Sequence, residues 1–505
     1  MKKIKDKNNL ILVGLAFIYA LIYIYRMFTN NPWYDELYTY YSFISRGPIY
    51  AAIHWPLPNN HIGYSAISGF LSYFGNPTIA LRGISFICAV ANIFLVYKLA
   101  NSLTGKRRAY IAVFIYAGVF QVHNMAVQGR GYTLSTTCYL IALLMLLNIF
   151  NAKDKWIHYF LYMCVLALGI YAVPSSTFWV IPVCVFGGIY LLCAKEYKRL
   201  IKLIIFSALA ALIALSLYAT VWLAIGSNLL SKTADSGYFG VYQIEVIKKA
   251  PALSLKTGLD YMLASPYIQS MDRNIVINGL FYYLEALFEQ FYGGLGIAII
   301  VFLFVSGVVA TVRFIKQRNR VLELFIAVSV IMLPIMLIVQ SVQPYLRVFS
   351  YFGLVLSFSV IMYLNVDKTT IYNNIATVII GVLFIGLLFT YKYMMPMADR
   401  ENDIKDICDE LILNGTTMNE IGSIYYTDDY QKYVFKFYYD VDPVEAPMGE
   451  AEYVFVSDTV KNSEIEGIVW PMLTSYPNFD FDLLNSDYED VLDLGTYSIY
   501  RHKDN

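Results

Sequence analysis

Residues 10–28 read LILVGLAFIYALIYIYRMF, an apolar run that follows the basic start Lys2–Lys7. About twenty apolar residues in a helix span the hydrocarbon core of a bilayer. The run lacks a small-residue cleavage site, so it predicts a retained first transmembrane helix and not a cleaved signal peptide. The chain of 505 residues is 58% hydrophobic and 15% charged, whereas soluble domains have about 25% charged residues. The sequence therefore predicts a polytopic α-helical membrane protein.

Apolar stretches of similar length recur up to residue 393. They lie at about 10–28, 79–101, 109–123, 132–150, 157–173, 177–193, 201–225, 287–312, 321–341, 345–364 and 373–393. Every second short loop between them is basic and contains, in turn, Lys106–Arg108, Lys153 and Lys155, Lys195–Arg199, Arg313–Arg320 and Lys368. The intervening loops hold little basic beyond Arg46 and Arg130, as the positive-inside rule requires of outer loops. We therefore expect about eleven transmembrane helices and a cytoplasmic N-terminus.

Three larger segments are then expected outside the cytoplasm: the loops 29–78 and 227–283, and the tail. Acidic residues far outnumber basic ones in the tail. A polar helix near 399–413, strand-like runs at 423–427 and 453–457, and a closing pair of strands around 491–501 predict a small α/β fold there. The predicted domains are a transmembrane body over 1–394 and an extracytoplasmic α/β domain over 395–505.

The first outer loop begins with Asn31-Pro32-Trp33-Tyr34-Asp35-Glu36-Leu37, a few residues after the first helix. Two adjacent carboxylates flanked by aromatic residues near a bilayer surface are typical of an acid/base or metal-binding pair. Apolar surroundings and mutual repulsion keep one of them usable as a base near neutral pH. The same residues equally fit the start of an interfacial helix, with Asp35 capping the free N–H groups of its first turn. Both interpretations stay open on local sequence alone.

Further along this loop lies the run His54-Trp55-Pro56-Leu57-Pro58-Asn59-Asn60-His61. The prolines stiffen the backbone, and Asn60 and His61 offer donors and acceptors suited to sugar hydroxyls. His61 is also a candidate metal ligand. A single histidine is more often structural than functional, so a packing role for His61 stays open.

The positions of three arginines in the predicted topology indicate a binding partner. Arg82 opens the second predicted span, Arg130 lies between the third and the fourth, and Arg347 opens the tenth, so helix parity assigns all three to the outer face. An arginine at the centre of a bilayer costs about 2.5–3.5 kcal/mol, and the positive-inside rule disfavours arginine at outward ends. Arginine suits bidentate contacts with phosphate oxygens, which predicts a phosphorylated lipid headgroup as the partner. Snorkelling or interhelix pairing is the alternative for at least one of them, and Tyr132 beside Arg130 offers an aromatic contact.

Five short motifs follow one another over about the first 150 residues. They are Trp33-Tyr34-Asp35-Glu36, Pro58-Asn59-Asn60-His61, Leu81-Arg82-Gly83-Ile84-Ser85, Leu103-Thr104-Gly105 and Gln128-Gly129-Arg130-Gly131-Tyr132-Thr133-Leu134. In this order and spacing, the chain resembles the GT-C glycosyltransferases, specifically the bacterial family 39 and dolichyl-phosphate-mannose protein mannosyltransferase-like group. The many-helix body and the outer C-terminal domain extend the resemblance.

The resemblance implies transfer of a hexose from a polyprenyl-phosphate carrier to a lipid-linked glycan, cell-wall polymer or protein. The reaction would take place on the outer face of the cytoplasmic membrane. By the same resemblance Asp35 is expected to be the general base, and Glu36 to orient the site or help hold a divalent cation. Arg130 and Arg347 are expected to stabilise the leaving phosphate, and His61 to contact a substrate or the cation.

Other functions stay open on the sequence. The chain contains no Walker A sequence, dinucleotide fingerprint, Ser-His-Asp arrangement or HExxH motif, so no nucleotide site or nucleic-acid partner is expected. A transporter or flippase for a lipid-linked glycan would need polar residues continuing through the bilayer core. A glycan polymerase or ligase would place arginines and a histidine in a large late loop, and the loop 227–283 has Arg273 but no histidine.

Overall fold

The computed structural model describes residues 2–53, 60–151, 155–225, 273–364, 371–394, 399–413, 415, 421–426, 429–442, 444–457, 480–493 and 497–504. The segment His54–Asn59 and most of the predicted outer loop 227–283 lie outside the described residues. The chain divides into two compact units. Unit 1 comprises Met1–Thr29 and Phe43–Met395, and unit 2 comprises Asn30–Ser42 and Pro396–Asn505. The segment Asn30–Ser42, expected as part of an outer loop of the membrane body, thus folds with the C-terminal residues.

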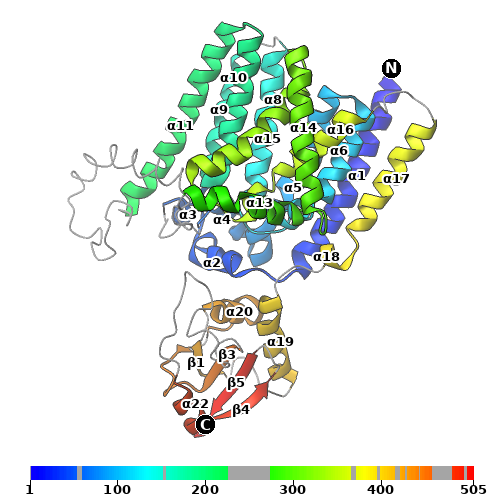
Figure 1. Cartoon of the computed structure of the whole chain (residues 1–505). Helices are drawn as coiled ribbons and strands as arrows, with labels where there is room; N and C mark the ends of the chain where they lie inside the picture. Colours follow the sequence, from blue (N-terminus) through cyan, green and yellow to red (C-terminus); the bar gives the residue numbers. More distant parts are fainter. Residues whose placement is uncertain are drawn as a thin grey trace. The chain divides into compact units, whose positions relative to one another are not determined.

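All regular secondary structure in the described residues of unit 1 is helical (Figure 1). Its first half contains α1 (Lys2–Thr29), η1 (Ile44–Arg46), α3 (Pro48–Ile53), α4 (Ile62–Leu71), η2 (Ser72–Phe74), α5 (Pro77–Leu103), α6 (Lys106–Gly118), α7 (Phe120–Met125), α8 (Tyr132–Phe150) and α9 (Trp156–Ala172). Its second half contains η3 (Pro174–Ser176), α10 (Thr177–Cys193), α11 (Tyr197–Ile225), α13 (Arg273–Glu289), α14 (Gly296–Lys316), α15 (Val321–Gln340), η4 (Leu346–Phe349), α16 (Phe352–Tyr363), α17 (Ile371–Leu387) and α18 (Tyr391–Met394).

Seven helices within the described residues are long and apolar enough to cross a membrane, and three shorter apolar helices accompany them. The predicted polytopic helical fold is therefore confirmed, while the number of eleven crossings stays a prediction. Three predicted spans are interrupted. The run 109–123 breaks after Gly118, 345–364 begins with the short η4, and 287–312 is divided near Gly294, whose φ of +80° is the left-handed conformation that glycine tolerates.

Small residues allow close packing between the helices of unit 1, as is usual in membrane proteins. Helix α8 packs against α9 and α10 (Figure 1). A Cβ atom on Gly169 of α9 would lie 2.5 Å from the Trp179 ring of α10, so only glycine leaves room for this buried indole. The indole is oriented by its Nε1–H, which donates to Ser135 Oγ of α8 at 2.8 Å.

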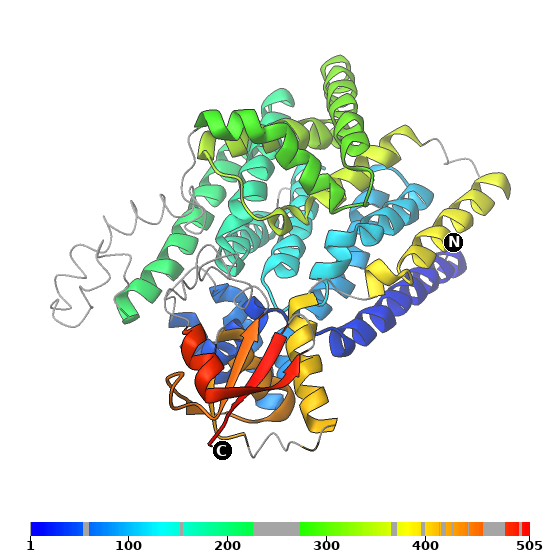
Figure 2. The ribbon, with the colours of Figure 1, turned by 60° about the horizontal axis from the view of Figure 1, so that its bottom comes forward.

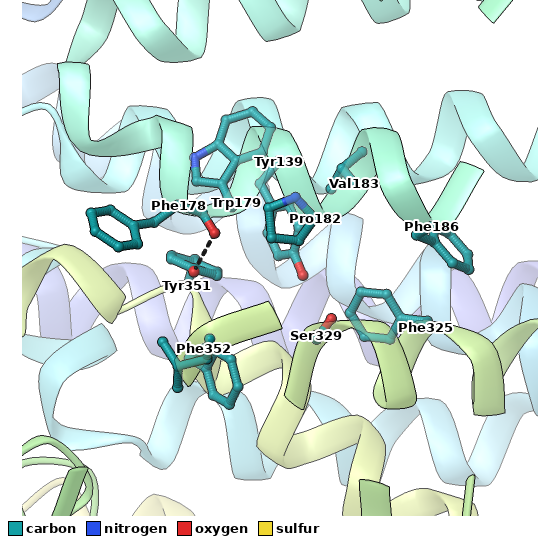
Figure 3. A pocket seen from close by; sticks show the side chains of 11 residues that line it. Tyr139, Phe178, Trp179, Pro182, Val183, Phe186, Phe325, Ser329, Tyr351 and Phe352 are labelled. Atoms are coloured by element: carbon teal, nitrogen blue, oxygen red, sulfur yellow. Dashed lines mark hydrogen bonds between the residues drawn. The ribbon is translucent and has the colours of Figure 1, made fainter. Parts of the chain in front are cut away.

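Helices α8, α10, α15 and α16 enclose a narrow, mainly aromatic crevice (Figure 3). Tyr351, just before α16, closes one end of it by donating from its hydroxyl to the Phe178 carbonyl oxygen at 2.9 Å. Phe349 of η4 lies edge-on to Phe178 with a ring-centroid separation of 5.0 Å. These contacts fix the short η4 turn, which also contains Arg347, against α10.

Unit 2 is built on a five-stranded sheet with the order β2-β1-β3-β5-β4 (Figure 2). The strands are β1 (Ser423–Tyr426), β2 (Val444–Glu445), β3 (Tyr453–Ser457), β4 (Tyr488–Asp493) and β5 (Tyr497–His502), and the helices are α2 (Tyr34–Ser42), α19 (Asp399–Leu413), α20 (Asp429–Tyr439) and α22 (Phe481–Asp487). β1 is parallel to β2 and β3, whereas β5 is antiparallel to β3 and β4. The predicted small α/β domain is thus present as a mixed sheet with helices.

The two faces of this sheet carry separate hydrophobic cores, because side chains alternate along a strand. Tyr453 and Phe455 of β3 belong to one core, together with residues of α19 and α20. Val454 and Val456 belong to the other, together with Leu484 of α22. Leu37 of α2 is fully buried in the first core. The segment from the first outer loop therefore completes one face of the C-terminal fold.

Candidate functional site

The turn that follows α7 is held by the helix α5 beneath it. Ser85 Oγ lies 2.5 Å from the Gln128 carbonyl oxygen and 3.3 Å from that of Arg130. A Cβ on Gly129 would lie 2.4 Å from the Leu81 side chain and 2.9 Å from its carbonyl oxygen. The Leu81–Ser85 and Gln128–Leu134 motifs are therefore one structural unit, in which the first supports the turn that presents Arg130.

His61 is bonded to the same turn. The residue precedes α4 and is 4% exposed. The Gly131 N–H donates to His61 Nδ1 at 2.9 Å, and Arg130 Nη2 lies 3.1 Å from His61 Nε2. Burial, together with the guanidinium groups of Arg130 and Arg347, holds the pKa of His61 well below its usual range. The imidazole is therefore neutral near pH 7.

A neutral imidazole has one N–H and one acceptor nitrogen. Because Nδ1 accepts from the backbone of Gly131, the proton of His61 is on Nε2. That N–H then faces Arg130 Nη2, which can only donate. One oxygen atom of a ligand can accept from both groups at once. His61 and Arg130 are therefore chemically suited to an oxygen-rich, anionic ligand.

Tyr132 and Arg347 adjoin this pair. The Tyr132 ring is perpendicular to that of His61, with centroids 5.0 Å apart. Arg347 Nε donates to Tyr132 Oη at 3.3 Å, and its guanidinium lies 4.6 Å from the centre of the Tyr345 ring. The structure thus brings together four of the residues that the sequence assigned to substrate binding: His61, Arg130, Tyr132 and Arg347.

Gly131→Ala should disrupt this arrangement. Its φ of −67° and ψ of −3° suit any residue, but a Cβ would lie 2.5 Å from the Ala172 carbonyl oxygen and 3.3 Å from His61 Nδ1. The clash is with a backbone atom, which cannot move without disturbing the packing of the helix. We therefore expect a loss of about 1–3 kcal/mol in stability and weaker binding of an anionic substrate. Gly386→Ala, where a Cβ meets nothing within 4 Å, is the control. Equal melting temperatures and affinities for the two variants would contradict the prediction.

Asn60 and Arg82 have structural contacts. Asn60 is buried, and its Nδ2 donates to the Ala51 carbonyl oxygen of α3 at 3.0 Å. Arg82 is also buried and donates from Nη1 to the Met27 carbonyl oxygen at 2.9 Å. This bond joins α5 to the last turn of α1, which is the interhelix pairing considered as an alternative for these arginines. A substrate role for either residue stays a prediction.

Arg26 is a buried cation that the sequence reasoning did not single out. It is fully buried, and it donates to the His123 carbonyl oxygen at 2.7 Å and to Asn124 Oδ1 at 3.2 Å. Neither acceptor is charged, and Arg26 has no carboxylate partner among the described residues. Its position at the outward end of the first span is the signal that could have identified it, because the argument is the one applied to Arg82.

Asp35 and Glu36 belong to unit 2, in the first turn of α2. Asp35 is partly exposed, whereas Glu36 is buried and accepts the Trp33 backbone N–H on Oε2 at 3.0 Å. Trp33 immediately precedes α2, and its carbonyl oxygen accepts the N–H groups of Glu36 and Leu37. Glu36 therefore caps the start of the helix in the manner of the third residue of a capping box. The capping role considered for Asp35 stays a prediction.

We expect Glu36→Gln to preserve folding and most of any activity, because the amide oxygen still accepts the Trp33 N–H. Glu36→Ala leaves that N–H without its side-chain acceptor and should cost about 1 kcal/mol of stability. Melting temperature and activity of both variants check the prediction. An equal, severe loss of activity in both would mean that the negative charge of Glu36 is required, as the predicted metal or catalytic role supposes.

A metal site at Glu36 and His61 remains a prediction. Among the described residues, no group of three or more His, Cys, Asp or Glu side chains could hold a metal ion. The two predicted ligands belong to different units, and each has its own hydrogen-bond partner.

Residues 62–223 match the family model described as dolichyl-phosphate-mannose-protein mannosyltransferase. The matched region contains Arg82, Arg130 and Tyr132, and it includes the Leu81–Ser85 motif together with the turn after α7 that this motif supports. In structure, the chain is similar to the Archaeoglobus fulgidus oligosaccharyltransferase in complex with Zn and sulfate, with a TM-score of 0.51 and 15% identity over 88% of this chain and 68% of that one. The chain has a GT-C fold. The predicted resemblance to GT-C glycosyltransferases is thereby confirmed.

Two further structures of the archaeal enzyme align with this chain. The apo form has a TM-score of 0.47 at 13% identity and covers 89% of this chain and 70% of its own. The form tethered to an acceptor peptide with the NVT sequon has a TM-score of 0.46 at 15% identity. That alignment covers 97% of this chain and 74% of the archaeal chain. At sequence identities this low, the similarity to the archaeal enzyme concerns the fold and not the activity. No curated protein sequence matches the chain significantly.

Proposed function

We propose that the protein transfers a sugar from a polyprenyl-phosphate carrier to an acceptor at the outer face of the cytoplasmic membrane. The observation that carries this proposal is the buried cluster of His61 and Arg130, whose Nε2 and Nη2 atoms lie 3.1 Å apart, with the charge of Arg347 nearby. A phosphate oxygen accepts from both at once and places negative charge beside two arginines. The match of residues 62–223 to mannosyltransferases that use a dolichyl-phosphate carrier supports the same class of donor.

The phosphate would be held by Arg130, His61 Nε2–H and Arg347, with Tyr132 orienting the last of these. In the reaction, an acceptor hydroxyl oxygen bonds to the anomeric carbon as the bond from that carbon to the phosphate oxygen breaks. The electron pair of the broken bond stays on the phosphate, whose charge increases, and the arginines stabilise that increase. The hydroxyl proton passes to the carboxylate of Asp35, the proposed general base. A single displacement of this kind inverts the anomeric centre.

The test is sugar transfer by the purified protein in nanodiscs, with labelled polyprenyl-phosphate sugars as donors and a native membrane-glycan extract as acceptor. The proposal expects label to move to the acceptor, and parallel assays with a chelator decide whether a divalent cation takes part. Tight binding of the donor with neither transfer nor hydrolysis would refute the enzymatic proposal and favour a carrier of lipid-linked glycans.

The proposed orientation has the N-terminus in the cytoplasm and unit 2 outside. It rests on the basic loops after α5, α8, α10 and α14. Reporter fusions that are active on only one side of the membrane test it when placed at each end of the chain. Activity of an outside reporter at the N-terminus would reverse the assignment.

A further inference from the structure

One face of helix α2, which carries Asp35, is built into the core of unit 2. Tyr34, Leu37 and Tyr41 are spaced at i, i+3 and i+7 and therefore form one stripe along the helix. Leu37 is fully buried among residues of α19, α20, β1, β3 and β5. Tyr34 and Tyr41 are partly buried against the same core. Asp35 lies outside the stripe and is partly exposed.

Aromatic contacts with α20 fix the orientation of this stripe. The rings of Tyr41 and Tyr433 are stacked, with centroids 5.6 Å apart and an angle of 6° between their planes. Tyr34 and Tyr38 contact the same Tyr433 ring at 6.1 and 6.2 Å. Parallel and edge-on contacts on one ring leave α2 little freedom to rotate about its axis.

The residues before α2 are tied to the same helix. Tyr438 Oη donates to Asn31 Oδ1 at 2.5 Å, so α20 holds both the entry to α2 and its apolar face. A helix of nine residues is not stable by itself in water. The position of α2 is therefore determined by the core on which it packs, and that core is formed by residues after 398.

We propose that the C-terminal unit is the positioning element for the catalytic base. Leu37, Tyr433 and Tyr438 act as positioning residues, which set the orientation of Asp35 without touching the reacting atoms. The inference rests on the proposed role of Asp35. A displacement of about 1 Å in a catalytic group reduces the rate on the order of 100-fold, whereas donor binding by residues of unit 1 is not altered by such a displacement. Loosening α2 should thus lower kcat and leave the KM for the donor unchanged.

The experiment compares Leu37→Ala and Tyr433→Ala with Leu484→Ala in the full-length protein. Leu484 is buried to a similar degree but lies in the core on the opposite face of the sheet, away from α2. All three variants lose buried contacts in unit 2. We expect the first two to reduce kcat about tenfold or more, with the KM for the donor within twofold of wild type. Leu484→Ala should retain kcat within twofold, and Tyr433→Phe, which keeps the ring, should restore the wild-type rate.

Hydrogen exchange of the α2 amides gives a second measurement that does not depend on activity. We expect slow exchange in the wild type and in Leu484→Ala, and fast exchange in Tyr433→Ala. Equal losses of kcat in Leu37→Ala and Leu484→Ala would overturn the proposal, since stability alone would then explain both. Fast exchange of α2 in the wild type would also overturn it. An inactive wild type with slowly exchanging α2 would instead refute the proposed transferase function.

Discussion

Asp35→Asn is expected to abolish sugar transfer, with a reduction of kcat on the order of 100-fold to 10,000-fold, the range that general-base catalysis contributes. The amide has nearly the shape of the carboxylate but cannot accept the proton of the acceptor hydroxyl. Its neighbours in α2 stay in place, because Leu37 and the tyrosine stripe hold the helix and Glu36 caps its start. The measurement is transfer from a labelled polyprenyl-phosphate sugar, together with donor binding, which should stay within twofold of wild type.

The control for this variant is Asp490→Asn, which removes an exposed carboxylate from β4 of the same unit. It should transfer sugar at the wild-type rate. If Asp35→Asn is as active as Asp490→Asn, the base must be another group. If both variants are inactive and unstable, unit 2 tolerates no loss of charge and the specific role of Asp35 is again refuted.

Arg130→Ala should weaken binding of the sugar donor more than binding of the acceptor. Loss of a buried, charge-assisted contact to phosphate costs about 1.5–3 kcal/mol, which corresponds to roughly a 10-fold to 150-fold loss of donor affinity. His61 Nε2–H would remain as a donor to the phosphate. The KM for the acceptor should be unchanged, because the acceptor carries no part of the leaving phosphate. Arg130→Lys keeps the charge but not the planar fork, so its donor affinity should be intermediate.

Arg318→Ala is the matched control for charge, since Arg318 is exposed in the loop between α14 and α15. Its donor affinity should equal that of the wild type. A donor affinity unchanged in Arg130→Ala would refute the phosphate site at His61 and Arg130. A melting temperature near that of wild type is required of Arg130→Ala for the comparison to be valid.

The helical membrane body could be predicted from the sequence because its signal is local. A run such as 10–28 is apolar over its whole length, and lipid is the solvent that such a run requires. The small sheet domain was also predictable, since β-branched and aromatic residues cluster in runs such as Tyr453–Ser457. Breaks within spans, as at Gly118, were missed because hydropathy does not record where a helix turns.

The grouping of His61, Arg130 and Arg347 was partly predictable. Helix parity assigns them to one side of the membrane, but parity gives no lateral position. The bond between Gly131 and His61 depends on packing of α4 against α5 and α9, which no local pattern contains. Arg82 shows the limit of helix parity as a guide. Parity assigns it to the same side of the membrane, yet its side chain joins α5 to α1 through the Met27 carbonyl oxygen.

The membership of Asn30–Ser42 in unit 2 could have been suspected from the stripe Tyr34, Leu37 and Tyr41, which leaves an amphipathic helix without an obvious partner. What the sequence does not contain is the identity of that partner, because the residues that cover Leu37 lie beyond position 398. Contacts between residues so far apart depend on the shapes of both surfaces. The capping of α2 by Glu36 was similarly hidden, since its carboxylate could equally have been catalytic.

Unit 2 is formed from two segments that lie far apart in the sequence, so one of them is synthesised long before the other. Residues 30–42 are translated before the whole of 43–395, and the core that stabilises α2 is translated only after that stretch. At about 5–20 residues per second this delay is roughly 20–70 s. During that time α2 has no surface on which to fold, and nine residues do not form a lasting helix unaided. The chain therefore acquires a positioned Asp35 only after the C-terminal residues of unit 2 have been made, so a nascent protein that stops before them has its membrane helices but no ordered α2.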